Sequence, residues 1–294
     1  MSSIPENIGR IIYLGTPEIA VAPLRDLHLA GLEIPLVVTG KDKRRGRGSE
    51  ESPSPVKQEA QKLGLSITHN LEEVMAVEAD LGVVVAYGEL ISEEILNSLP
   101  MVNMHFSLLP RWRGAAPVER AILSGDELTG VCIMQIEKEL DTGPTFRRSA
   151  IPILGTDMLG DLKLKLSDEG RSLLLDCVLN GFGAATPQIG KSSYAKKIQP
   201  DELQIDWEQS TEQICRLIRL EKAWTTVKGN RLSILEARIA DLKDLLPGQV
   251  QGTVVGAGDG SVELLSVKPA GGRRIQGKDW VNGLHLDAKD RLGG

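Results

Sequence analysis

Cysteine and aromatic residues are scarce in this chain of 294 residues. Its three cysteines, Cys132, Cys177 and Cys215, are far apart in the sequence, and no C-x-x-C pair occurs. These features argue against a disulfide framework and a cysteine-ligated zinc site, so we predict no bound metal. Because aromatics make up only 3% and hydrophobic residues 41%, the core must be built mainly from Val, Ile, Leu and Ala.

Long apolar runs and a secretory start are also missing. No apolar run approaches the ~20 residues of a membrane span, and the start, MSSIPENIGRIIYLG, has no basic stretch followed by an apolar one. We therefore expect a cytoplasmic protein with no membrane partner. The net charge of −6 argues against indiscriminate coating of nucleic acid but allows a local basic patch.

Three common enzyme motifs are absent. The first strand is followed by Gly15-Thr16-Pro17 where a dinucleotide-binding turn would read G-x-G-x-x-G. Neither a Walker A loop nor an H-E-x-x-H sequence occurs. These absences count against an NAD enzyme, a nucleotide phosphohydrolase and a zinc hydrolase.

Apolar segments alternate with segments of helical character in the first part of the chain. Strands are predicted at residues 10–14, 34–39, 81–87, 101–105 and 130–136, and helices near 17–30, 55–63, 92–98, 116–124 and 157–180. Thr16 is the expected N-cap of the first helix, with Pro17 at its first position. This alternation predicts a Rossmann-like, doubly wound, mostly parallel sheet in an α/β domain.

The amino-acid composition becomes polar and irregular after Gly181, and the chain is therefore predicted to have three regions. Residues 1–183 form the α/β domain, 184–204 are polar and irregular and form a linker, and 205–294 form a second domain. The second domain has one helix-like segment and several short strand candidates, with a tight hairpin at Asp259-Gly260. We expect it to be a small OB-like β-barrel.

Asn103 and His105 are the first candidate catalytic residues. Both lie in the predicted strand 101–105, whose period of two places their side chains on one face and Met104 on the other. Ligands of open α/β sheets bind at the carboxyl ends of strands, where this pair falls. An Asn amide can hold a developing oxyanion, and a histidine can accept or deliver a proton at physiological pH.

Asp141 is the candidate partner of His105. It follows the predicted strand 130–136, and consecutive parallel strands are often neighbours, so we expect it to approach His105. An oxyanion donor, a proton relay and an orienting carboxylate together suit direct acyl transfer to an amine. Such a reaction passes through a tetrahedral intermediate and needs no acyl-enzyme.

Two alternatives stay open at this point. Each of these residues is also compatible with a purely structural role in a turn. A Ser107–His105–Asp141 hydrolase triad is the other possibility, although the G-x-S-x-G elbow that would expose such a serine is missing.

The chain also carries seven stretches that point to one family: GTPEIAVAPL, PSPVK, VVVAYG, NMHFSLLPRWRGAAPVERAI, TGVCIMQIEKELDTGP, SYAKKI and IDW. On these stretches it resembles the methionyl-tRNA formyltransferase family of the formyltransferase superfamily, over nearly its full length. The Asn…His…Asp set alone marks the whole superfamily, and SLLPRWRGAAP with the second domain narrows the match.

The resemblance implies substrates and roles. The formyl donor would be 10-formyltetrahydrofolate, and the acceptor the amino group of methionine on initiator tRNA. Asn103, His105 and Asp141 stand at the family's catalytic positions. The segment associated with folate matches Ser107, Leu108, Leu109 and Pro110. Alternatives are a formyltransferase for a sugar nucleotide or another small amine, and a non-catalytic protein that binds tRNA or folate. We expect a monomer.

The chain also has a basic loop that matches the family and two positions where it differs from the family's usual pattern. The stretch GKDKRRGRGSEESPSP matches the family's tRNA-contacting loop, which implies tRNA-binding roles for Lys43, Arg44, Arg45 and Arg47; a merely solvated charge run is the alternative. The segment IRLEKAW, which ends at Trp224, is shorter than in relatives. Phe106 replaces a small residue, and by alternation it should point away from the catalytic face.

Overall fold

The computed structural model of the chain describes residues 4–44, 51–242, 244–283 and 290–293. These residues fall into two compact units. The first holds Met1–Pro117, Leu128–Pro152 and Lys163–Lys196, and the second holds Val118–Glu127, Ile153–Leu162 and Lys197–Gly294. Arg45 and Arg47, two of the predicted tRNA contacts, lie outside the described residues.

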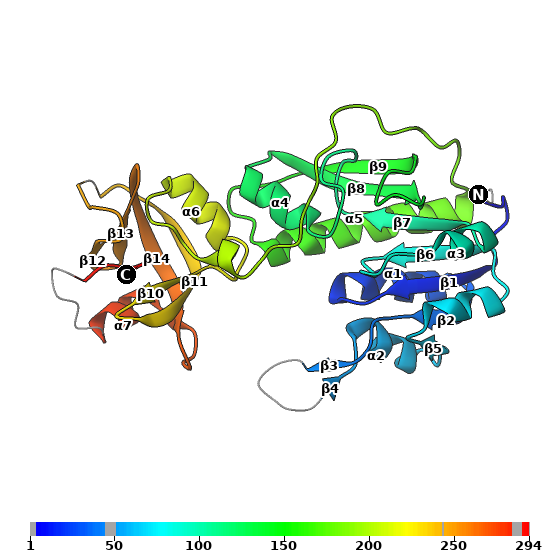
Figure 1. Cartoon of the computed structure of the whole chain (residues 1–294), viewed down its shortest axis with the longest axis horizontal. Helices are drawn as coiled ribbons and strands as arrows, with labels where there is room; N and C mark the ends of the chain where they lie inside the picture. Colours follow the sequence, from blue (N-terminus) through cyan, green and yellow to red (C-terminus); the bar gives the residue numbers. More distant parts are fainter. Residues whose placement is uncertain (1–3, 45–50, 243, 284–289, 294) are drawn as a thin grey trace. The chain divides into compact units, whose positions relative to one another are not determined.

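The first unit is built on a seven-stranded sheet with the order β5-β2-β1-β6-β7-β8-β9 (Figure 1). The strands β5, β2, β1, β6 and β7 are parallel, and β8 and β9 are antiparallel to their neighbours. The strand bounds are β1 Arg10–Gly15, β2 Glu33–Val38, β5 Ile67–Thr68, β6 Leu81–Val85, β7 Met101–His105, β8 Leu128–Gln135 and β9 Thr145–Pro152.

The crossover segments are mainly helical. They are η1 Glu18–Ala20, α1 Val21–Leu29, α2 Pro55–Lys62, η2 Leu71–Ala76, α3 Glu93–Ser98 and α4 Pro117–Ser124. Helix α5 Leu159–Asn180 follows β9, and most of α4 and the first turn of α5 belong to the second unit. From β1 the chain first adds β2 and β5 on one side and then β6 and β7 on the other. The predicted doubly wound, mostly parallel sheet is therefore confirmed, with its switch point between β1 and β6.

β8 lies beside β7 as predicted, but its predicted parallel direction is wrong. β8 runs antiparallel to β7, with Cys132 opposite His105 and Gln135 opposite Val102. The loop that carries Asp141 therefore starts beside the amino end of β7 and has to return across the strand. An apolar strand covered on both faces has the same composition in either direction, so its sequence does not distinguish the two orientations.

Thr16 is not the helix N-cap that the sequence predicts. The first helical turn begins at Glu18 after Pro17, and no side chain caps it. The Thr16 hydroxyl donates to the Tyr87 carbonyl at 3.3 Å and accepts from the Gly40 amide at 3.1 Å. It thus ties together the segments that follow β1, β2 and β6, at the switch point of the sheet.

The alternation of β7 is as predicted. Met104 is buried toward α5, where a Cβ added to Gly170 would lie 2.7 Å from the Met104 sulfur. Asn103 and His105 therefore face the other side of the sheet. Phe106, just after the strand, is buried as well, with 7% of its surface exposed.

The second unit contains an antiparallel sheet with the path β10-β11-β14-β13-β12, and β15 pairs with β14 (Figure 1). Its elements are η3 Asp201–Leu203, α6 Thr211–Ile218, β10 Trp224–Val227, β11 Asn230–Ala240, β12 Val250–Gln251, β13 Val254–Ala257, β14 Gly260–Pro269, β15 Ile275–Gln276 and α7 Gly277–Asn282. The predicted hairpin is confirmed, because Ala257 pairs with Gly260. Buried residues such as Trp207, Ile234 and Trp280 form its core.

The shortened segment before Trp224 makes a tight turn. Helix α6 begins at a capping box formed by Ser210 and Gln213 and ends at Ile218. Glu221 then adopts a positive φ of 62°, and Leu220 and Ala223 are buried on either side of it. The Glu221 carboxylate accepts from the Gly160 amide at 2.8 Å. A helix end and one left-handed residue are enough to connect α6 to β10.

Candidate active site

Asn103 and His105 lie where β7 ends, and Asp141 meets both. Asn103 Nδ2 donates to Asp141 Oδ1 at 3.4 Å, and His105 Nδ1 lies 3.6 Å from Asp141 Oδ2. The side chains of His105 and Asp141 are only 5% and 9% exposed. The three predicted catalytic side chains are therefore brought together, in a place where low water access strengthens their electrostatic interactions.

The second nitrogen of His105 is also engaged. His105 Nε2 lies 2.9 Å from the Trp112 carbonyl oxygen, which can only accept a hydrogen bond. In the neutral imidazole the proton is thus on Nε2, and the lone pair of Nδ1 faces the Asp141 carboxylate. Two proton acceptors thus face each other across 3.6 Å, an arrangement that can hold one added proton between them.

Two residues of this arrangement, Trp112 and Gly114, were missed by the sequence analysis. The Gly114 amide donates to Asp141 Oδ2 at 2.7 Å and fixes the carboxylate beside His105. Gly114 has φ +114°, and a Cβ there would lie 2.9 Å from the Ala195 carbonyl, so only glycine fits without displacement. The sequence signal was the glycine after RWR, which marks a close approach of two backbones.

Ser107 does not face His105. Its buried hydroxyl donates to the Arg111 carbonyl at 2.6 Å, while His105 Nε2 is turned toward Trp112. A serine nucleophile needs a hydrogen bond from its hydroxyl to the general base. Ser107 instead holds the turn that follows β7, which argues against the hydrolase triad.

Cys132 is the other nucleophile near the site. It stands opposite His105 in the β7–β8 register but is fully buried, in a cluster with Leu109 and Met134. Burial raises the pKa of the Cys132 thiol to about 11. A buried, protonated thiol is a poor nucleophile, so neither Ser107 nor Cys132 is set up to form an acyl-enzyme.

The predicted folate segment is split between the core and the surface. Ser107 and Leu109 are buried, whereas Leu108 and Pro110 are partly exposed. The Leu109–Pro110 peptide bond is cis. Contacts from this segment to a ligand must come from Leu108, Pro110 or backbone groups.

The basic loop starts from a short hairpin. Strands β3 (Lys43–Arg44) and β4 (Glu51–Ser52) pair antiparallel, with Lys43 opposite Ser52. Lys43 is exposed. At the base of the hairpin Lys57 Nζ lies 2.7 Å from Asp42 Oδ2, an ion pair that anchors the first arm to α2.

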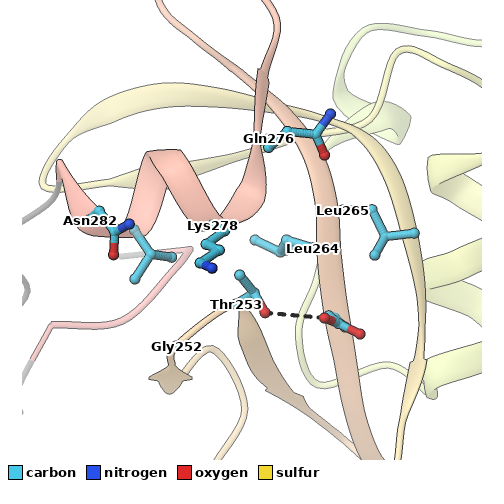
Figure 2. Close-up of a pocket in the computed structure, with 9 residues that line it drawn as sticks. Gly252, Thr253, Leu264, Leu265, Gln276, Lys278 and Asn282 are labelled. Atoms are coloured by element: carbon cyan, nitrogen blue, oxygen red, sulfur yellow. Dashed lines mark hydrogen bonds between the residues drawn. The ribbon is translucent and has the colours of Figure 1, made fainter.

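The second unit has a hollow of different chemistry (Figure 2). It lies between β14 and α7, and its polar lining includes Gln276, Lys278 and Asn282. The Thr253 hydroxyl in its lining donates to Glu263 at 3.3 Å. Among the described residues, no histidine or cysteine lines this hollow, so they offer nothing there comparable to the Asn103–His105–Asp141 set. Across the described part of the chain, no group of three or more His, Cys, Asp or Glu side chains is arranged to hold a metal ion, and no helix is long and apolar enough to cross a bilayer.

The chain matches two protein-family models and curated relatives over nearly its full length. The Formyl transferase model matches residues 9–178, and the model for the Formyl transferase C-terminal domain matches residues 197–285. The methionyl-tRNA formyltransferase of Jannaschia sp. (strain CCS1) is 38% identical over 294 residues, which cover 94% of this chain and 97% of the relative. The chain therefore belongs to the methionyl-tRNA formyltransferase family of formyl transferases.

Two solved structures share the fold at low sequence identity. HypX from Aquifex aeolicus in complex with tetrahydrofolic acid has a TM-score of 0.67 at 16% identity; the match covers 93% of this chain but only 47% of that one. An N-formyltransferase from Helicobacter canadensis, in complex with folinic acid and dTDP-3-aminofucose, has a TM-score of 0.68 at 19% identity. That match covers 87% and 98% of the two chains.

Proposed function

We propose that this chain transfers a formyl group from 10-formyltetrahydrofolate to the amino group of methionine on initiator tRNA, for translation initiation. The observation that carries the proposal is the convergence of Asn103, His105 and Asp141 in a chain of this family, beside a Ser107 hydroxyl bonded to a carbonyl and a buried Cys132 thiol. Without an acyl-enzyme, the acceptor amine itself must attack the formyl carbon.

The proposed reaction begins with attack of the acceptor amine on the formyl carbon. The amine nitrogen forms a bond to the formyl carbon, and the carbonyl π electrons move onto oxygen. An N–H of Asn103 stabilises this oxyanion, an effect worth ~3–4 kcal/mol in well-studied sites. The proton of the new ammonium passes to the His105 Nδ1–Asp141 pair. The bond from carbon to N10 of the folate then breaks, the carbonyl re-forms, and N10 takes up the proton held by the His105–Asp141 pair, which returns the pair to its starting state.

The acceptor suits a site of this kind. A free α-amino group has a pKa of about 7.7–8.0, so roughly a tenth of it is already neutral at pH 7. The protein therefore has to remove a proton only during or after the attack. His105 and Asp141 are placed for this step.

We assign the donor to the surface around Leu108 and Pro110, where apolar side chains and backbone groups can hold a flat pterin. Support comes from two proteins of similar fold whose structures contain tetrahydrofolic acid or folinic acid. In this proposal residues 1–183 bind folate and carry out the reaction, 184–204 form the linker, and 205–294 grip the tRNA. No metal takes part.

An acceptor panel tests the proposed activity. The protein is incubated with 10-formyltetrahydrofolate and, in turn, initiator methionyl-tRNA, free methionine and an amino-sugar nucleotide, and release of tetrahydrofolate is followed. We expect turnover with methionyl-tRNA at least ~100-fold above the other amines, the level that shape and hydrogen bonding can supply. Preference for the sugar nucleotide would overturn the proposal in favour of a related transferase. Binding without turnover would indicate a non-catalytic binding protein.

The basic loop, the stretch GKDKRRGRGSEESPSP, is the proposed contact to the tRNA acceptor stem. We expect Arg47→Ala to weaken binding and formylation of tRNA by about tenfold or more, because the planar arginine side chain contacts phosphate or guanine in two places. Folate binding should not change. Lys62→Ala, which removes an exposed positive charge elsewhere, is the matched control. Equal losses in both variants would contradict the assignment.

The predicted neighbours Arg45, Arg44 and Lys43 should contribute less individually and mainly to the salt dependence of binding. We further propose that the chain acts as a monomer. We place it in the cytoplasm, where its aminoacylated tRNA acceptor is made.

A further inference from the structure

Two residues of the active site hold an unusual backbone conformation. Trp112 has φ 62° and Asp141 has φ 53°, in the left-handed region that residues with a Cβ seldom adopt. Each supplies one of the two acceptors around His105: the Trp112 carbonyl faces Nε2, and the Asp141 carboxylate faces Nδ1. Such conformations persist only where surrounding contacts fix them.

One side chain of the segment before the second domain contacts both loops. Gln188 Nε2 donates to the Asp141 carbonyl at 2.9 Å and to the Gly143 carbonyl at 2.8 Å. Gln188 Oε1 accepts from Arg113 Nε at 3.1 Å and from Arg113 Nη2 at 2.7 Å. Both amide hydrogens and both oxygen lone pairs are thus used, and they bridge the loop of Asp141 to the loop of Trp112.

Ser193 fixes the other left-handed residue. Its Oγ accepts from the Trp112 amide at 3.0 Å, and its carbonyl accepts from the Arg113 amide at 2.9 Å. The Arg113 carbonyl in turn accepts from the Ala195 amide at 2.6 Å. Residues 188–195 therefore run along the active-site loop and are hydrogen bonded to it. They belong to the same compact unit as β7, although they lie outside the stretches matched by the two family models.

We propose that Gln188 is a positioning residue of the transfer reaction: it holds the Asp141 and Trp112 loops in the one arrangement that places an acceptor on each side of the His105 ring. This inference rests on the proposed function for its rate effects but not for the geometry of His105. A change at Gln188 should lower kcat and leave KM nearly unchanged, because Gln188 touches the reacting groups only through other residues.

Gln188→Glu is the most informative variant, because it removes the amide donors of Gln188 and changes the size of the side chain very little. One carboxylate oxygen keeps the contact to Arg113, but the other faces the Asp141 and Gly143 carbonyls and has no hydrogen to donate. Displacement of Asp141 by about 1 Å would cost ~100-fold in kcat. Gln199→Glu makes the same chemical change at another glutamine, whose Nε2 donates to the Lys197 carbonyl at 3.2 Å, and is the matched control.

Two measurements test the proposal. Steady-state kinetics should show kcat about 100-fold lower for Gln188→Glu, with KM values and thermal midpoint close to those of the wild type and of Gln199→Glu. Nitrogen NMR of the His105 ring, assigned with His105→Gln, should show shifted signals in Gln188→Glu only. Ser193→Ala removes the hydroxyl that accepts from the Trp112 amide and replaces Gln188→Glu if that variant does not fold; it should lower kcat severalfold.

The outcomes distinguish failure of the positioning role of Gln188 from failure of the proposed formyl transfer. If Gln188→Glu keeps wild-type kcat and wild-type His105 signals, the positioning role is overturned. A fall in thermal midpoint with unchanged kcat would overturn it as well, since that pattern marks a purely structural contact. If the wild type fails to transfer formyl groups while the His105 signals respond as expected, the proposed function fails and the positioning role stands.

Discussion

The Asp141 carboxylate connects the Gly114 amide to the His105 ring: the oxygen that accepts from Gly114 at 2.7 Å also lies 3.6 Å from His105 Nδ1. One side chain thus does two things. It holds the loop after β7 in place through a backbone bond, and it presents negative charge to the imidazole. The first function needs only an acceptor oxygen, whereas the second needs a charge.

Replacement of Asp141 by asparagine separates these two functions. Asp141→Asn can still accept from the Gly114 amide, but its NH2 group then faces Asn103 Nδ2, which loses its acceptor, so we expect the free energy of unfolding to fall by roughly 1–3 kcal/mol. The charge beside His105 is lost, and kcat should fall by about 100-fold or more. Kinetics together with urea unfolding check this, with the exposed Asp201→Asn as control. Near-normal kcat would mean that the carboxylate serves the loop alone.

Replacement of Ser107 should lower stability and leave activity nearly unchanged. Its hydroxyl donates to the Arg111 carbonyl and not to His105. Ser107→Ala should therefore retain kcat within severalfold and lose roughly 0.5–1.5 kcal/mol of stability, the usual net value of one hydrogen bond. Turnover and denaturant unfolding are the measurements. Loss of activity in a stable Ser107→Ala protein would revive the serine nucleophile.

All three thiols should be unreactive in the folded protein at neutral pH. Burial raises the pKa of Cys132, Cys177 and Cys215 to about 11. A raised pKa lowers the thiolate fraction, to about one in a thousand at pH 8, and the thiolate is the reactive form. A colorimetric disulfide reagent should modify the native protein far more slowly than the protein in urea. Cys215, the most accessible, should react about tenfold faster for each pH unit between 8 and 10.

Glu59 should contribute to stability in a pH-dependent way. Its buried carboxylate pairs with Arg25 and Lys62, and the hydrogen bond from Arg25 holds the pKa of Glu59 below its usual 4.5. A depressed folded-state pKa gives stability that is present above the unfolded pKa and is lost as pH falls through the folded value. Glu59→Gln should cost roughly 1–3 kcal/mol at pH 7, the range for a hydrogen bond to a charged group.

This difference should shrink as pH falls below about 4, where the wild-type carboxylate also becomes protonated. Urea unfolding at pH 7 and at acid pH measures it. Glu33→Gln, at an exposed ion pair with Arg10, should show little difference at either pH. A constant cost for Glu59→Gln at all pH values would indicate that packing and not charge is lost.

Much of the architecture followed from local pattern. The strand around Asn103 and His105 ends where predicted, and period-two alternation correctly separated this pair from Met104. The hairpin at Gly260 was likewise predicted, because turn residues act within a few positions of the chain. The direction of β8 was predicted wrongly, since a strand buried on both faces carries no polar side to mark its orientation.

By itself the sequence determined the class of sheet, the face of β7 that carries the amide and the imidazole, and the three side chains of the candidate chemistry. The tertiary structure alone decided how Asp141 reaches them, and that Trp112, Gly114 and Gln188 complete the arrangement. The physical reason lies in the range of the forces. Periodicity and capping are read from neighbours in the chain, whereas a hydrogen bond across 47 positions, such as the one from Gln188 to Asp141, exists only after the chain has folded.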